Sequence, residues 1–515
     1  MKKELKIMKR YQLYLLPALI AAMLQLTACN DWLDVDSDTN VVQEILFDDF
    51  EGYRTAVNGV YMLLGSEQLY GRELTWGALS ALGRNYDSTA ESPVPARYKN
   101  LVQNDYSASS STAVIDPIWA KAYNTIANCN NIINHIEQES PSFFPRKGER
   151  DLILGEMLGV RAMLHLDMVR LFTPATAVDD GREYIPYMEV YPLRSSTHLT
   201  VTQLMEKIIA DLERSRELLR NNDNPEEGLS DSFSSTAIRF YSRLVNLDLF
   251  YNYRGIRMNY FAATALLARA HLWRNGAGDR QAAYDYANVL YDYHVASNAS
   301  ASRRRFSFTA ATSLQANNAA TFRKMYDDVL FAAYNSTLPD LATPQVFNEE
   351  YRLANVGTAT EAGPLFAQGA DDFRRLTLIE GTTYRTSIRW QLPISTSALS
   401  QDVITQGRIA PVIRMSEMFY IMCEHLADSD LTTAYARLNA VRSARGCKTA
   451  LTVGTKETLL DQLVLEMTRE FMTEGQTFFQ YKRLNRPLYN GTTPFDMTGR
   501  YVLPVPRSEN EYLNL

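Results

Sequence analysis

The chain of 515 residues is 46% hydrophobic and 22% charged, the composition of an ordinary globular protein with ample material for a core. Its formal net charge of −7 becomes −11 when residues 1–28 are set aside, because they hold five basic residues and one acidic residue. This balance argues against nucleic acid or an anionic membrane surface as the main partner. Four irregularly spaced cysteines give neither a disulfide framework nor a zinc site.

The first 28 residues predict an export signal that ends at a lipid-attachment cysteine. MKKELKIMKR is basic, and the apolar run YQLYLLPALIAAMLQL is shorter than the roughly 20 residues that a spanning helix needs. Leu26-Thr27-Ala28-Cys29 then resembles a bacterial lipobox, in which the thiol takes a diacylglycerol thioether. We expect Cys29 to anchor an exported protein, with residues 29–45 as a tether. A chance cysteine in a cleavable signal is the alternative.

Helical periodicity predicts a mainly α fold. Apolar residues recur at steps of three and four over 118–138, 149–172, 200–220, 259–293, 412–445 and 456–484. In the stretch 259–293 a Gly-Asp-Arg turn separates two helices that carry small residues, which allow close antiparallel packing. This pattern resembles a tetratricopeptide repeat and recurs at 412–445. The chain therefore predicts about four helix pairs stacked around a continuous core.

Two long irregular stretches interrupt the helices, at about 69–115 and 295–410. The second is rich in Ser, Thr, Asn, Ala and Gln, with short β-like pieces such as RRFSFT and TSIRWQL. Irregular stretches of this length inside a compact protein are usually functional. We interpret both as excursions from one helical scaffold, which together with a C-terminal block at about 411–515 forms a single domain from residue 29 onward.

Six segments along the chain together carry a family resemblance. They are Cys29-Asn30-Asp31-Trp32-Leu33-Asp34-Val35, IWAKAYNTIANCNNIINHI, GEMLGVRAMLHLDMVRLF, RMSEMFYIMCEHLA with AYARLNAVRSARG, TREFMTEGQTFFQYKRL, and YVLPVPRSENEYLN. In this order they resemble the SusD/RagB family of Bacteroidetes surface lipoproteins over nearly all of residues 29–515. The chain departs from the family's E-x-R-x-x-D-x-x-R pattern, which reads Glu474, Thr477, Gln480 and Arg483 here and puts one internal polar contact in doubt.

The resemblance implies a non-enzymatic lipoprotein at the cell surface, anchored in the outer membrane as the lid of a SusC-like TonB-dependent transporter. The cargo it implies is typically a glycan oligosaccharide, and in the RagB branch a peptide. A surface glycoside hydrolase is the alternative from another class, but no HExxH, G-x-S-x-G or P-loop motif supports an enzyme. No cofactor is expected; calcium is the open alternative, but Asp34, Asp36 and Asp38 lack the Gly and Glu of a calcium loop.

Aromatic and polar residues of the two excursions are the candidate ligand-binding residues. Aromatic rings stack on the C–H faces of sugars, while amide and guanidinium groups bind hydroxyls. This reasoning selects Trp76, Arg84, Asn85 and Tyr86 in the first excursion and Tyr334, Tyr384, Arg389 and Trp390 in the second. Core packing is an equal alternative for Trp76, which stands near three leucines. Trp119 and Trp273 lie in helical stripes and are expected in the core.

Overall fold

The computed structural model describes residues 46–87, 94–192, 197–223, 233–299, 306–315, 323–346, 348–382, 384–391, 400–489 and 494–512. The predicted lipid attachment at Cys29 and the tether 29–45 lie outside these residues. Contacts divide the chain after Tyr53 into two compact units, residues 1–53 and 54–515, and all packing described below lies within the second.

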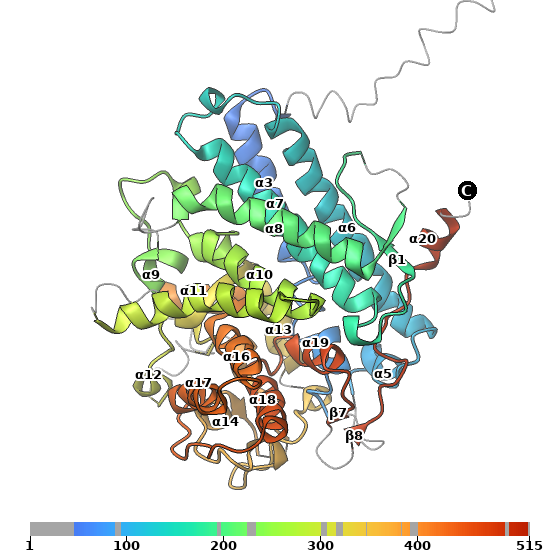
Figure 1. Ribbon diagram of the computed structural model, residues 1–515, viewed down its shortest axis with the longest axis vertical. Helices are drawn as coiled ribbons and strands as arrows, with labels where there is room; N and C mark the ends of the chain where they lie inside the picture. Colours follow the sequence, from blue (N-terminus) through green and yellow to red (C-terminus); the bar gives the residue numbers. More distant parts are fainter. Residues whose placement is uncertain are drawn as a thin grey trace, which may run out of the picture. The chain divides into compact units, whose positions relative to one another are not determined.

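Long helices pack against their neighbours along the sequence, so that the scaffold is a stacked array. The array consists of α6 (Ser109–Ile136), α7 (Glu149–Phe172), α8 (Val201–Asp223), α10 (Tyr260–Arg274), α11 (Asp279–Ala299), α16 (Met415–Leu426) and α17 (Leu431–Ala444), each packed on the next (Figure 1). Nearest-neighbour packing of this kind is typical of helix-pair repeats. The prediction of a mainly α, SusD-like fold is confirmed.

The stretch 456–484 was predicted as one helix, and this prediction is wrong. The structure has α18 (Lys456–Glu470) and α19 (Gln476–Arg483), separated by a turn. Within this turn Thr473 and Gly475 have φ angles of 61° and 79°, which a continuous right-handed helix does not allow. A Cβ added at Gly475 would lie 2.3 Å from the backbone oxygen of Leu74, so only glycine fits this approach.

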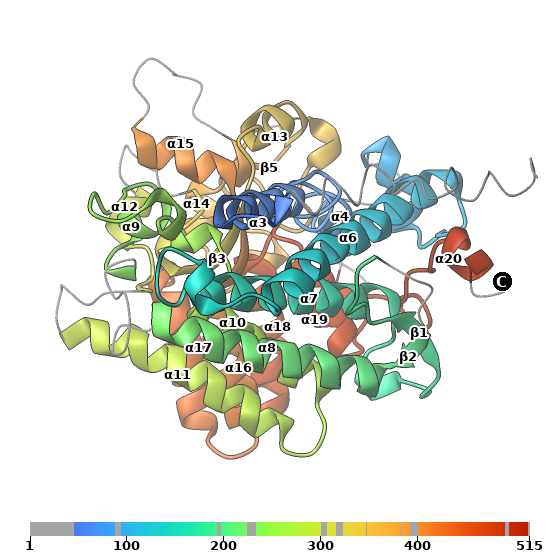
Figure 2. The same cartoon turned by 90° about the horizontal axis from the view of Figure 1, so that it is seen from above.

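Shorter elements fill the space around the array. The remaining helices are α3 (Phe50–Leu64), α4 (Ala78–Leu82), α5 (Lys99–Val102), α9 (Thr236–Phe240), α12 (Ala311–Gln315), α13 (Leu338–Val346), α14 (Phe373–Thr377), α15 (Gln401–Arg408) and α20 (Arg507–Tyr512). Figure 2 shows α13 and α15 on one side of the array. In the described ranges, no helix has both the length and the apolar character that crossing a bilayer requires.

Helix α7 packs between α6 and α8, and its residues 152–172 are all buried. A helix buried on every face must pair its polar side chains internally. Glu156 accepts from Arg257 at 2.9 Å, and the Nε2 atom of His165 accepts from the Met188 backbone N–H at 3.0 Å. Burial lowers the pKa of His165 to about 3, so the imidazole is neutral. The polar residues of this segment thus hold the scaffold together.

The strands form two-stranded antiparallel ladders, which are β1 (Glu183–Pro186) with β2 (His198–Thr200), β3 (Val329–Tyr334) with β6 (Ile409–Arg414), β4 (Ile379–Glu380) with β5 (Thr386–Ser387), and β7 (Leu488–Tyr489) with β8 (Pro494–Phe495). In the β3–β6 ladder, Val329 pairs with Arg414 and Tyr334 with Ile409. This ladder joins the two ends of the stretch 335–408, so the second excursion leaves and re-enters the scaffold at one place.

Candidate functional site

The two excursions meet in space through backbone hydrogen bonds. Tyr86 forms an antiparallel bridge with Leu353, and the Ala354 N–H donates to the Asn85 oxygen at 2.9 Å. The Leu353 N–H donates in turn to the Arg385 oxygen at 2.7 Å. Segments that are hundreds of residues apart in sequence therefore lie side by side, and they bring candidate residues of both excursions together.

Trp76 lies at the centre of this meeting point and is completely buried. Its indole N–H donates to the Gly71 oxygen at 3.0 Å, and its own backbone oxygen accepts from the Tyr86 hydroxyl at 2.5 Å. The Trp76 ring centroid lies 6.5 Å from that of Trp390 and 6.0 Å from that of Tyr351. These spacings are those of packed aromatic pairs.

Trp390, from the second excursion, is equally buried. Its indole N–H donates to Thr473 Oγ1 at 2.9 Å, which satisfies the ring's polar atom without solvent. Lys324 Nζ lies 3.3 Å from the ring centroid, in the position of a cation–π contact. Burial lowers the pKa of Lys324 well below its ordinary value.

The polar candidates Asn85 and Arg389 bind the turn between α18 and α19. Asn85 Oδ1 accepts from the Thr473 N–H at 3.2 Å, while its Nδ2 donates to Thr477 Oγ1 at 3.2 Å. Arg389 forms a buried ion pair with Glu474. Thr477 is one of the positions where the chain departs from the family pattern, and here it accepts a hydrogen bond from the first excursion.

The other candidates differ in their exposure. Arg84 is buried, and its Nη2 donates to the Val102 oxygen at 2.9 Å. Its guanidinium lies 3.6 Å from the Phe495 ring centroid. Burial lowers the pKa of Arg84 to about 10. Tyr334 and Tyr384 are only partly buried. The structure thus brings Trp76, Tyr86 and Trp390 into one aromatic cluster.

For the two tryptophans of the cluster, these surroundings favour core packing over ligand stacking, because a ring enclosed on all sides offers no face to a solute. Core packing of Trp119 and Trp273 is confirmed, since both are buried. Ligand contact by any of the eight candidate residues stays a prediction.

A buried ionic network holds the second excursion against α18. Arg445 pairs with Glu470 at 2.5 Å and with Asp328 at 2.5 Å, while Arg414 pairs with Glu474 at 2.6 Å. Burial alone would raise the pKa of Glu470, but the arginines around it, Arg445 first, hold that pKa well below its usual range. Glu470 is therefore a carboxylate that binds arginine in the folded protein.

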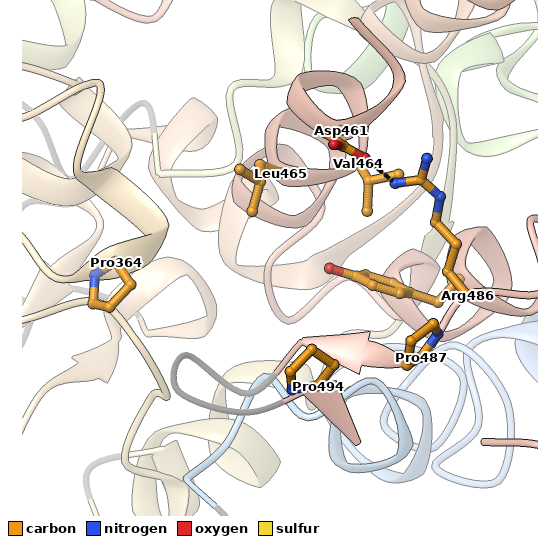
Figure 3. A pocket seen from close by; sticks show the side chains of 8 residues that line it. Pro364, Asp461, Val464, Leu465, Arg486, Pro487 and Pro494 are labelled. Atoms are coloured by element: carbon orange, nitrogen blue, oxygen red, sulfur yellow. Dashed lines mark hydrogen bonds and ion pairs between the residues drawn. The ribbon is translucent and has the colours of Figure 1, made fainter. Parts of the chain in front are cut away.

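A pocket of about 570 Å³ opens on the other face of α18 (Figure 3). Its lining is mostly apolar and comes from Pro364, Val464, Leu465, Pro487, Pro494 and the ring of Tyr481, which also carries a polar hydroxyl. Its charged groups are Asp461 and Arg486, whose Oδ1 and Nη1 atoms lie 2.5 Å apart. This volume lies within the range of roughly 300–1,000 Å³ that small-molecule sites occupy. A pocket with mostly apolar walls and a few polar groups can bind and orient a small molecule.

A smaller cavity lies between α18 and the meeting point of the excursions. Arg84 and Asn85 line it together with Ala354, Thr468 and others. Two of the candidate residues therefore border an internal space, although neither lines the larger pocket.

Sequence reasoning missed the residues of the larger pocket. Asp461 lies in the stretch 456–484, which was predicted only as helical, and Arg486 and Pro487 lie just beyond its end. The available signal was the sequence Asn485-Arg486-Pro487, because asparagine in a left-handed conformation followed by proline is typical of a helix C-terminus. In the described ranges, no three His, Cys, Asp or Glu side chains gather as metal ligands.

Comparisons with known proteins place the chain in a family. Residues 31–245 match a family model described as "Starch-binding associating with outer membrane", and residues 248–503 match the model of the SusD family. The two matches together span nearly the whole chain. The protein belongs to the SusD family.

Solved structures show the same fold. A SusD-like carbohydrate binding protein from Bacteroides vulgatus is 15% identical with a TM-score of 0.62, covering 90% of this chain and 96% of that one. A SusD superfamily protein from Bacteroides thetaiotaomicron is 20% identical with a TM-score of 0.62, covering 90% and 98%. Another from Bacteroides vulgatus is 17% identical with a TM-score of 0.65, covering 90% and 97%. No curated protein matches the chain.

Proposed function

We propose that this protein is a non-enzymatic surface lipoprotein that captures an oligosaccharide and delivers it to a SusC-like TonB-dependent transporter. The observation that carries the proposal is the pair of SusD family matches over residues 31–245 and 248–503. The name of the similar Bacteroides vulgatus structure, a carbohydrate binding protein, supports a glycan as the cargo. The pocket of about 570 Å³ beside α18 supports the proposal, because its volume is typical of small-molecule sites.

Electrophoresis of the purified protein in native gels that contain amylopectin, arabinoxylan, galactomannan or polygalacturonate tests this proposal. We expect retarded migration in at least one gel, with no new reducing ends after long incubation. New reducing ends would assign the protein to the surface glycoside hydrolases instead. Unretarded migration in all four gels, together with binding to peptides, would favour a RagB-type peptide lid.

Anchoring is tested at Cys29, the predicted site of lipid attachment. We propose that Cys29→Ala releases the protein from the outer membrane, since a diacylglycerol group is the attachment that the lipobox predicts. Fractionation of cells that lack the transporter measures this. The matched control is Cys447→Ala, which removes a buried thiol and leaves the anchor intact. A Cys29→Ala protein that stays in the outer membrane would contradict the proposal.

Partnership with the transporter is tested by mild detergent extraction of the lipoprotein from its native membrane. We expect a TonB-dependent barrel to co-purify in a defined ratio.

The half-buried candidates Tyr334 and Tyr384 need less rearrangement of the core to contact a ligand than the enclosed tryptophans do. Among the candidate residues of the excursions, they are therefore the first to substitute.

A further inference from the structure

One wall of the pocket beside α18 is formed by the C-terminal end of α19. The Arg486 N–H donates to the Tyr481 oxygen at 3.0 Å, and the Asn485 N–H donates to the Lys482 oxygen at 3.0 Å. With Asn485 at a φ of 48°, these are the two bonds of a Schellman motif. Pro487 follows and cannot continue the helix. The backbone thus fixes where the side chains of Tyr481 and Arg486 begin.

Two further elements complete the walls. The β7–β8 ladder pairs Tyr489 with Pro494 and so places this proline beside the end of α19. Across the pocket lies Pro364, the first residue of the short helical turn 364–366, and α18 contributes Leu465 between them (Figure 3). Proline rings are rigid and carry no N–H donor, so these walls offer apolar C–H surface and little else.

The charged groups of the pocket form a single ion pair. Asp461 Oδ1 and Arg486 Nη1 lie 2.5 Å apart, and the two side chains are 57% and 31% exposed. The pair therefore presents hydrogen-bond acceptors and donors side by side, within reach of a solute. Its net charge is zero.

We propose that this pocket binds a neutral sugar unit with two adjacent free hydroxyls. The apolar face of the ring packs on Leu465, Tyr481 and the prolines. One hydroxyl donates to Asp461, and the neighbouring hydroxyl oxygen accepts from Arg486. The inference rests on the proposed function, and adds to it the place and the charge class of the ligand.

The ion pair also selects against charged ligands. A uronate or sulfated sugar would have to compete with Asp461 for Arg486 and would leave two anions close together. A cationic ligand would face the same conflict at Arg486. A neutral diol keeps the pair intact and adds hydrogen bonds to both of its charged members, which are stronger than bonds between neutral groups.

Isothermal titration with maltoheptaose, xylohexaose, mannohexaose and oligogalacturonate tests the proposal. We expect the wild type to bind a neutral probe, and Asp461→Asn and Arg486→Gln each to weaken that binding about tenfold or more. The matched control is Glu189→Gln, which breaks the exposed pair with Lys207 (2.6 Å) elsewhere on the surface. The control should bind like the wild type.

A second variant blocks the pocket while leaving its ion pair in place. Leu465→Trp fills the space with a larger ring, and we expect it to abolish binding without lowering the melting temperature, because Leu465 is only partly buried. This variant separates loss of the site from loss of the fold.

The outcomes distinguish the inference from the proposed function. Neutral binding that survives Asp461→Asn, Arg486→Gln and Leu465→Trp overturns the inference and leaves glycan capture standing. Binding of oligogalacturonate in preference to the neutral probes does the same. A wild-type protein that binds none of these probes, while it binds peptides, overturns both.

Discussion

Helix α18 forms arginine–carboxylate ion pairs on two opposite faces, and these pairs have different roles. On its inner face, α18 carries Glu466 and Glu470, both fully enclosed with arginines. On its outer face, Asp461 pairs with Arg486 while the Asp461 side chain remains 57% exposed. Because Asp461 and Glu470 are nine residues apart, at about 100° per residue, they point in opposite directions.

The difference between the two faces shows what burial does to an arginine–carboxylate pair. Inside, water cannot replace a lost partner, so each charge depends on the others. Outside, water competes continuously, and the pair contributes little to folding. A pair that remains exposed can form additional hydrogen bonds with a ligand.

The largest effect we expect is from breaking the inner network. Glu470→Gln leaves Arg445 and Arg374 without one of their buried carboxylates, and should cost about 3–5 kcal/mol of unfolding free energy. Urea denaturation followed by circular dichroism measures it. Glu457→Gln, the same change on the exposed first turn of α18, is the control and should stay close to wild type. Equal stability of the two variants would remove the contrast between the faces.

A comparable loss is expected from the aromatic cluster. Trp390→Ala empties a fully buried site and should cost about 3–5 kcal/mol of unfolding free energy. Tyr384→Ala, at a half-buried position of the same excursion, should cost clearly less. Thermal unfolding alongside ligand titration compares them. If Trp390→Ala melts like the wild type but loses its ligand, the ring belongs to a binding surface and the packing interpretation is wrong.

The helices that could be predicted from the sequence are the long ones with a sustained helical period. The stretch predicted at 149–172 coincides with α7, which no proline interrupts and within which Gly155 and Gly159 remain helical. The break between α18 and α19 could not be predicted from the sequence, because a glycine such as Gly475 is tolerated within a helical pattern. The break depends on a tertiary contact, the close approach of Leu74 to Gly475.

The candidate site was harder to predict, for a physical reason. An aromatic residue in an irregular segment suits both a wet surface and a core, and only the fold decides how much of Trp76 is covered. Likewise, Arg389 and Glu474 are 85 residues apart, so their pairing leaves no trace in local spacing. The pocket depends on the end of α19, where a local signal existed at Asn485 but its consequence for Arg486 required the neighbouring elements.

Lowering the pH should further distinguish the ion pairs on the two faces of α18 by their effect on stability. Glu470 has a folded-state pKa well below 4.5, so its contribution to stability is complete above pH 4.5 and is lost as the pH falls toward the folded value. Wild-type stability should therefore fall more steeply than that of Glu470→Gln in this range, by about 1.4 kcal/mol per pH unit for this one proton. Burial raises the pKa of Asp328 and repulsion from Glu470 adds to it, so Glu470→Gln removes one cause of this second shift as well. Parallel stability curves below pH 4.5 would contradict the assignment.

Substituting Asn485, at the end of α19, should have a smaller effect on the unfolding free energy. Asn485 has a φ of 48°, and a left-handed conformation costs about 1–2 kcal/mol for residues other than glycine and, less so, asparagine. Asn485→Ala should therefore lower the unfolding free energy by about 1 kcal/mol, whereas Asn485→Gly should be nearly neutral. Both are measured by urea denaturation. Since the same turn positions Arg486, the alanine variant should also weaken glycan binding; normal binding with reduced stability would show that the pocket does not depend on this turn.

We expect the smallest effect on stability from breaking the Asp461–Arg486 pair on the outer face of α18. Asp461→Asn should change the unfolding free energy by less than about 1 kcal/mol, because water replaces the lost partner of Arg486. It is isosteric and makes the same chemical change as Glu470→Gln on the opposite face of the same helix. Differential scanning calorimetry in low and high salt should show a difference from wild type that shrinks further as salt screens the pair. A loss as large as that of Glu470→Gln would mean that Asp461 supports the fold, and the contrast between the two faces of α18 would be wrong.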